Sequence, residues 1–171
     1  FLPDVCIPFG GIWQSARLAA FASAAISELQ VQAQADNGKV TLKSHLHHAI
    51  GMVANITITD AENMEQASSR TIVTEAALTT EITLDTVQQW GIDKPTLYRA
   101  IIRLEEANGN TAAEVARTFG FRSLSRQGDQ LLLNNQPVFL RGVLNWGWYP
   151  EILCPAPDEA IIREEFRRIR A

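Results

Sequence analysis

Apolar and polar side chains alternate with a period of two along much of this chain, which is the pattern of strands with one buried and one solvated face. The alternation is regular over residues 28–35, where polar residues at even positions separate apolar residues at odd positions. Asp36, Asn37 and Gly38 then form a typical tight-turn sequence, and the alternation resumes over residues 39–50. The two stretches predict a β-hairpin. The residues expected to face inward are Leu29, Val31, Ala33, Ala35, Val40, Leu42 and Leu46.

Runs rich in threonine and β-branched residues predict further short strands. These runs are residues 55–60 (NITITD), 70–76 (RTIVTEA) and 81–87 (EITLDTV). The polar residues 60–68 are expected to be a connection between two strands. A second hairpin is predicted over residues 96–122, with its turn at 108–110 and with Tyr98, Ala100, Ile102 and Leu104 facing inward. Seven or so strands separated by turns predict an all-β fold, a β-sandwich.

Two segments depart from this alternation. Residues 13–25 are rich in alanine, and propensity alone favours a helix; we expect a strand, because two glycines precede the segment and strands follow it. Residues 157–171 change to a helical period, with Asp158 as a suitable N-cap and with arginines near the C-terminal end, where the helix dipole favours cations. The apolar face of this predicted helix consists of Ile162, Phe166 and Ile169, at positions i, i+4 and i+7.

Composition limits the classes of function. The chain has 171 residues, of which 46% are hydrophobic and 20% charged, and a net charge of −4 gives no broad basic surface for a nucleic acid. No apolar run approaches the roughly 20 residues of a membrane-spanning helix. Cys6 and Cys154 are too few for a disulfide framework and lack metal-ligand spacing. The first residue is not methionine and no signal peptide is recognisable, so the chain is interpreted as a piece of a longer protein and its compartment stays open.

Three neighbouring histidines are candidate metal ligands. Strand geometry places His45 and His47 on one face, but no carboxylate or cysteine accompanies them at ligand spacing, and structural zinc requires four ligands. We therefore expect exposed strand histidines and no metal site. His48 is expected to point to the opposite face and to be partly buried and hydrogen-bonded. No cofactor motif is recognised, since the two glycines that follow Phe9 lack the surroundings of a phosphate-binding loop.

Four motifs occur in a fixed order along the chain. They are IPFGGIWQSARL at 7–18, WGIDKPTLYRA at 90–100, FGFR at 119–122 and LLLNNQPVFLRGV at 131–143. In this order they resemble glycoside hydrolase family 2, the group of β-galactosidases, β-glucuronidases and β-mannosidases. The residues that carry the resemblance are Trp13, Trp90, Pro95, Leu97, Tyr98, Phe119, Phe121, Arg122 and Arg141.

The resemblance implies a division into three parts. Residues 1–11 resemble the exit from a jelly-roll sugar-binding domain, and residues 12–123 resemble the immunoglobulin-like sandwich that follows it. Residues 124–171 resemble the hairpin, first strand and first helix that begin a TIM barrel. The expected partners are the other domains of the same protein and, for the whole enzyme, a carbohydrate substrate.

The resemblance also implies that this chain by itself is not an enzyme. Family members are retaining hydrolases, which require two carboxyl groups about 5 Å apart. In the family both are glutamates on later barrel strands, which are absent here. Glu105 and Glu106 are expected to be neighbours on a strand that point to opposite faces, and Glu164 and Glu165 to lie on a solvated helix.

One stretch retains a possible link to substrate. A segment after the first barrel strand would lie where TIM barrels build their active sites, so Asn145, Trp146 and Trp148 are candidate walls of a sugar pocket in the whole enzyme. The alternative is that the tryptophans pack against other parts of the protein. Leu144 precedes Asn145 and matches neither galactosidases nor mannosidases, so the choice among galactoside, glucuronide and mannoside stays open. A different function, a free-standing carbohydrate-binding or adhesion module, also stays open.

Overall fold

The structure, a computed structural model, describes residues 16, 18, 20, 21, 23–144 and 158–170. The chain divides into two units, one of which is Ala20–Phe139; the other contains the helix α1 (Glu159–Arg170). Within the described residues, no helix has the length and apolar character needed to cross a bilayer.

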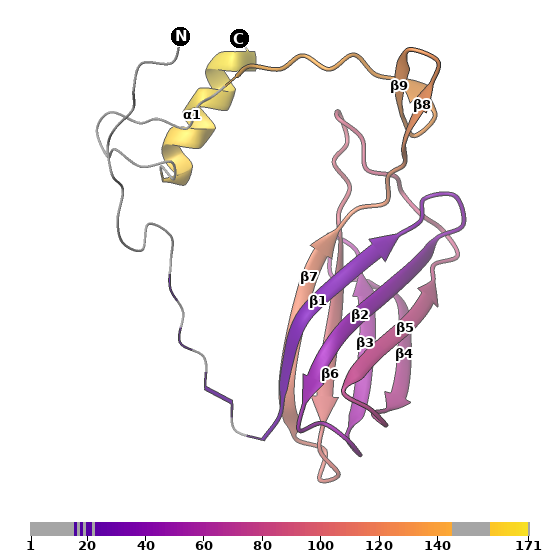
Figure 1. Ribbon diagram of the computed structural model, residues 1–171, viewed down its shortest axis with the longest axis vertical. Coiled ribbons are helices and arrows are strands. Elements are labelled where there is room, and N and C mark those ends of the chain that lie inside the picture. Colours follow the sequence, from indigo (N-terminus) through magenta and orange to yellow (C-terminus); the bar gives the residue numbers. More distant parts are fainter. Residues whose placement is uncertain (1–15, 17, 19, 22, 145–157, 171) are drawn as a thin grey trace. The chain divides into compact units, whose positions relative to one another are not determined.

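Seven strands of the larger unit form a sandwich of two antiparallel sheets (Figure 1). One sheet has the order β1-β2-β5 and the other the order β4-β3-β6-β7, with β1 and β7 side by side where the two sheets meet. This arrangement confirms the predicted all-β, immunoglobulin-like sandwich. The strands are β1 (Ala25–Ala33), β2 (Lys39–His47), β3 (Val53–Thr59), β4 (Glu65–Ile72), β5 (Ala77–Thr83), β6 (Tyr98–Glu105) and β7 (Thr111–Phe119).

A third, small antiparallel sheet follows the sandwich in the chain. It consists of β8 (Leu124–Gln127), β9 (Gln130–Leu133) and β10 (Gln136–Pro137), in the order β10-β9-β8. Residues 138–144 lie outside any strand. That residues 124–171 begin a TIM barrel stays a prediction.

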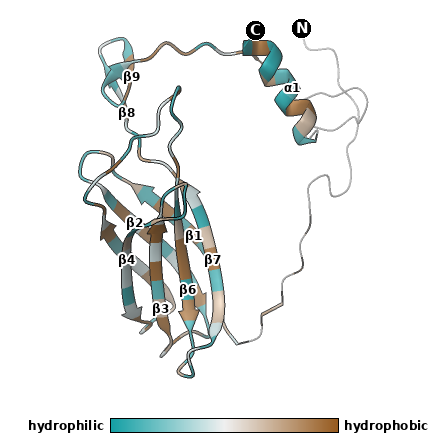
Figure 2. Ribbon diagram, turned by 180° about the vertical axis from the view of Figure 1, so that it is seen from behind, coloured by the Kyte–Doolittle hydropathy of each residue, from teal (hydrophilic) through white to brown (hydrophobic). Residues whose placement is uncertain are grey.

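The core lies between the two large sheets. Each central strand turns alternate apolar residues inward, so hydrophobic and polar positions succeed one another along the ribbons (Figure 2). Burial of each large aliphatic side chain contributes about 1.5–3 kcal/mol to folding. The inward positions predicted on β2 and β6 are confirmed. The fully buried side chains of the central strands include Val40, Leu42, Ile56, Ile58, Ala100, Ile102 and Leu104.

The first hairpin forms as predicted, with Ala33 opposite Val40. The Asn37 Oδ1 atom accepts a hydrogen bond of 3.0 Å from the backbone N–H of Lys39, and Gly38 adopts a φ of +68° that favours glycine. A β-bulge interrupts β1 between Ser27 and Gln30. The period-two pattern gave no signal for this bulge.

The boundaries of β4 correct one prediction. Residues 60–68 were expected to be a connection, but β4 begins at Glu65. The carboxylate of Asp60 keeps the connection between β3 and β4 short. It accepts hydrogen bonds from the backbone N–H groups of Glu62 and Met64 and from the side chain of Gln66. β4 is also an edge strand, so its polar side chains and one row of backbone groups can remain in water.

Two terminal predictions have different outcomes. A strand was predicted over residues 13–25. The described residues of this segment that precede Ala25 form no strand, so the prediction is wrong for these residues. The remaining residues of the segment before Ala25 lie outside the described part of the chain. The C-terminal helix is confirmed as α1, and Asp158 is its N-cap, since its Oδ1 atom accepts a hydrogen bond of 3.0 Å from the backbone N–H of Ile161.

His48 also differs from its prediction. It lies after the end of β2 with a φ of +54°, and its side chain is exposed, whereas Ala49 occupies the buried position. The left-handed backbone breaks the strand alternation, so the face expected for His48 no longer follows from its position in the sequence.

Candidate functional site at the loop end of the sandwich

Tyr98 is the centre of a group of aromatic residues where β6 begins and β7 ends. It is the first residue of β6 and is buried, with 4% of its surface exposed. Its hydroxyl accepts a hydrogen bond of 2.9 Å from the backbone N–H of Gln88. The centroid of its ring lies 5.8 Å from the ring centroid of Phe119, in stacked geometry, and 5.1 Å from that of Phe121, in edge-to-face geometry. A tyrosine at the start of this strand that binds upstream backbone is the tyrosine corner of immunoglobulin-like sandwiches.

Trp90 joins the connection between β5 and β6 to the end of β7. Its backbone N–H donates a hydrogen bond of 2.8 Å to the carbonyl of Phe121. The guanidinium of Arg122 lies 5.1 Å from the centre of the indole, a cation–π contact worth about 0.5–1 kcal/mol at an exposed site. The lack of a side chain at Gly120 lets Trp90 and Thr96 lie close to the backbone of Gly120. A Cβ atom at Gly120 would lie 3.2 Å from both the carbonyl oxygen of Thr96 and the Cβ of Trp90.

Asn134 links the small sheet to the sandwich. Its side-chain amide donates a hydrogen bond of 2.8 Å to the carbonyl of Trp90, and its Oδ1 atom accepts one of 3.0 Å from the backbone N–H of Ser123. Its own backbone N–H donates to the carbonyl of Ser123 at 2.9 Å. Asn134 and Asn135 have φ values of +52° and +63°, the signs of the type I′ turn that joins β9 to β10. We call these contacts the Asn134 joint.

The sequence did not single out Asn134 as a functional residue. The sequence does contain a signal for the turn, the dipeptide Asn134-Asn135 between two apolar segments, because asparagine tolerates positive φ and favours such turns. Its hydrogen bond to Trp90 joins residues 44 positions apart, and no local pattern predicts a contact at that separation.

The structure brings together five motif residues: Trp90, Tyr98, Phe119, Phe121 and Arg122. Pro95 and Leu97 are exposed and line a hollow of about 500 Å³ beside Tyr98. Arg141 is exposed and belongs to the other unit. The predicted site residues outside the described part of the chain are Trp13, Asn145, Trp146 and Trp148.

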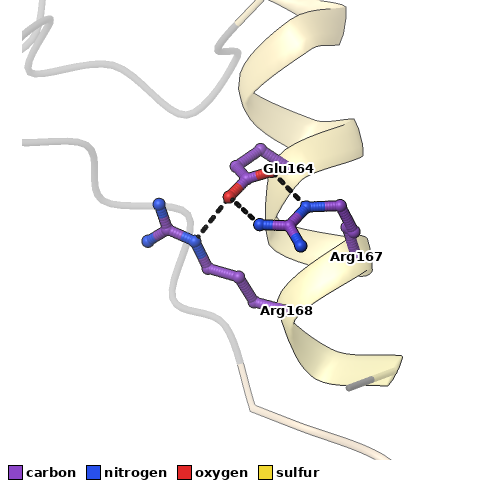
Figure 3. A network of polar contacts seen from close by, with 3 residues as sticks. All are labelled: Glu164, Arg167 and Arg168. Atoms are coloured by element: carbon purple, nitrogen blue, oxygen red, sulfur yellow. Dashed lines mark hydrogen bonds and ion pairs between the residues drawn. The ribbon is translucent and has the colours of Figure 1, made fainter.

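The glutamates considered for catalysis occupy unrelated positions. Glu105 ends β6, and Glu106 lies in the turn after it rather than on the strand, where its carboxylate accepts a hydrogen bond from the side chain of Asn108. On α1, hydrogen bonds from Arg167 and Arg168 lower the pKa of the Glu164 carboxyl to about 2 (Figure 3). A carboxyl group with so low a pKa is a poor proton donor near neutral pH.

Among the described residues, no group of three or more histidine, cysteine, aspartate or glutamate side chains is placed to hold a metal ion. The chemistry that the described loop end offers is backbone and side-chain hydrogen bonding, aromatic packing and one cation–π contact.

Two β-galactosidases are similar in sequence to part of this chain. A β-galactosidase of Photobacterium profundum is 35% identical over 77 residues, which cover 45% of this chain and 8% of the relative. A β-galactosidase of Pectobacterium atrosepticum is 39% identical over 62 residues, covering 36% of this chain and 6% of the relative. The chain thus spans less than a tenth of the length of these relatives in the aligned regions.

Solved structures share the fold at low sequence identity. A β-glucuronidase of Bifidobacterium dentium, solved in complex with coumarin-3-O-glucuronide, has a TM-score of 0.73 at 18% identity, over 87% of this chain and 26% of that one. A β-glucuronidase of Ruminococcus gnavus, solved with D-glucuronic acid, has a TM-score of 0.66 at 19% identity, over 86% and 24%. The sequence model of glycosyl hydrolases family 2 matches residues 24–122, the whole sandwich with its tyrosine corner. The chain belongs to glycosyl hydrolases family 2.

Proposed function

We propose that this chain is a non-catalytic structural part of a retaining β-glycosidase that hydrolyses terminal β-glycosides. The observation that carries the proposal is the Asn134 joint, because it attaches the sheet β8–β10 to the sandwich through hydrogen bonds to the backbone of Trp90 and Ser123. A sandwich with a filled apolar core and such an attachment is suited to hold neighbouring domains at fixed positions.

The proposal extends to the whole enzyme. Residues 1–11 would leave a sugar-binding domain, residues 12–123 would form the brace, and residues 124–171 would lead into a catalytic barrel. Asn145, Trp146 and Trp148 would then be candidates for the wall of the sugar pocket. The family match and the small share of each relative that this chain covers support this division.

An assay of this chain for glycosidase activity is the first test. We expect the purified 171-residue chain to turn over no aryl β-galactoside, β-glucuronide or β-mannoside, because the family's acid/base and nucleophile lie on barrel strands beyond it. A heat-denatured sample gives the background rate. Turnover clearly above that background would show that the chain has its own catalytic groups and would overturn the proposal.

The mass of the native polypeptide is the second test. A polypeptide several times heavier than 18.9 kDa, detected in its source by an antibody against this chain, supports a multidomain glycosidase. A native mass near 18.9 kDa would contradict it.

The free-standing carbohydrate-binding module receives no specific support. Such a module stacks sugars on neighbouring exposed aromatic rings. In the described part of the chain the exposed phenylalanines are Phe21, Phe139 and Phe166, which lie on three separate segments.

A further inference from the structure

Two histidine rings lie side by side on the outer face of the sheet β1-β2-β5. His45 and His47 are two positions apart on β2, so both side chains point away from the core, and both are exposed. Their ring centroids are 4.6 Å apart, with an angle of 50° between the ring planes. At this separation, small rotations of the side chains can direct one nitrogen of each ring at a common ion.

Ser27 orients one of these rings. Its hydroxyl lies on β1 opposite His45, donates a hydrogen bond of 3.3 Å to the carbonyl of His45 and lies 3.2 Å from the Nε2 atom of His47. With its proton directed to the carbonyl, the hydroxyl oxygen accepts a hydrogen bond from Nε2–H of His47, which leaves Nδ1 as the free acceptor. Metal-bound histidines characteristically donate their other ring N–H in this way, which sets the tautomer and the ring orientation.

The surroundings leave the histidine pair open to solvent. Small residues lie opposite the two histidines on the neighbouring strands: Ala25 faces His47 from β1, and Ala77 faces His45 from β5. A hollow of about 500 Å³ adjoins His47. Lys43 precedes His45 on the same face and disfavours cations, but its side chain is exposed and water screens its charge.

We propose that His45 and His47 form a two-imidazole binding site for Ni²⁺ or Cu²⁺, with water molecules in the remaining coordination positions. Imidazole nitrogen suits these borderline ions, and affinity for such ligands rises from Ni²⁺ to Cu²⁺. The site differs from the structural zinc site considered from the sequence, because it needs only two protein ligands. It does not depend on the proposed role in a glycosidase.

Titration of the 171-residue chain with Ni²⁺, followed by calorimetry, tests the proposal. Ni²⁺ is preferred as the probe because Cu²⁺ oxidises thiols and the chain has two cysteines. His45→Asn and His47→Asn should each weaken binding by at least about tenfold, because the second imidazole binds at high effective concentration once the first is bound. Both substitutions lie on an exposed strand face, and circular dichroism verifies that the fold is retained.

The third histidine supplies the matched control. His48 has a positive φ that asparagine tolerates, so His48→Asn removes an imidazole without disturbing the backbone. It should leave Ni²⁺ affinity unchanged. In nuclear magnetic resonance spectra, Ni²⁺ should broaden the amide signals of Ser27, His45 and His47 first. Equal affinity of all three variants, or loss of binding only in His48→Asn, would overturn the proposal.

Discussion

The Asn134 joint makes a prediction whose parts can be separated by substitution. Asn134→Gly keeps the positive φ without strain but removes both side-chain hydrogen bonds, to Trp90 and Ser123. Each part-buried hydrogen bond contributes about 0.5–1.5 kcal/mol, so the loss in the free energy of unfolding should be about 1–3 kcal/mol. Asn134→Ala loses the same bonds and adds about 1–2 kcal/mol, because an alanine Cβ clashes with the backbone at positive φ.

The assay combines urea denaturation with amide hydrogen exchange. Denaturation measures global stability. Exchange at the backbone amide of residue 134, which keeps its hydrogen bond to the carbonyl of Ser123 in Asn134→Gly, reports whether the small sheet detaches locally; a loss of about 1.4 kcal/mol accelerates exchange about tenfold. Asn135→Gly is the matched control, because Asn135 shares the turn and the sign of φ but makes neither hydrogen bond of the joint. If Asn134→Gly and Asn135→Gly have equal stability and equal exchange at the amide of residue 134 after correction for intrinsic rates, the joint does not hold the small sheet and the reasoning is refuted.

Two further predictions concern the first hairpin and the C-terminal helix. Gly38→Ala should lower the free energy of unfolding by more than about 2 kcal/mol, because the new Cβ would lie 2.5 Å from the carbonyl oxygen of Leu84 at a φ of +68°. Gly51→Ala is the control: its φ is +88°, but no atom lies within 4 Å of the new Cβ, so it should cost clearly less. Equal losses of stability in urea denaturation would contradict the steric argument. Glu164 should titrate near pH 2 in carboxyl-detected nuclear magnetic resonance, with its pKa rising when salt screens Arg167. Because this folded-state pKa lies below the ordinary value of 4.5, the ion pair stabilises α1 above about pH 4.5 and its contribution is lost as the pH falls towards 2; a titration near 4.5 at low salt would contradict the pairing.

Local pattern was sufficient wherever the structure follows a fixed period. The hairpin β1–β2, its turn at Asp36–Gly38 and the buried positions of β6 were all predicted from alternation and turn residues, and α1 was predicted from its apolar spacing and from Asp158. The motifs at 90–100 and 119–122 also indicated the family from the sequence alone. These features depend on residues within a few positions of one another, where backbone geometry alone decides which side chains share a face.

Tertiary structure decided the features that depend on distant residues. The sequence identified Trp90, Tyr98 and Phe121 as motif residues, but it did not show that Asn134 binds the carbonyl of Trp90. The start of β4 followed from how Asp60 closes its turn, and so lay outside the alternation rule. The sequence by itself thus determined the hairpin β1–β2, the inward faces of β2 and β6, the helix α1 and the family of this chain. The contacts that join the two large sheets to the small sheet β8–β10 were decided only when those strands packed, because hydrogen bonds between segments far apart in the chain form where packing places their donors and acceptors.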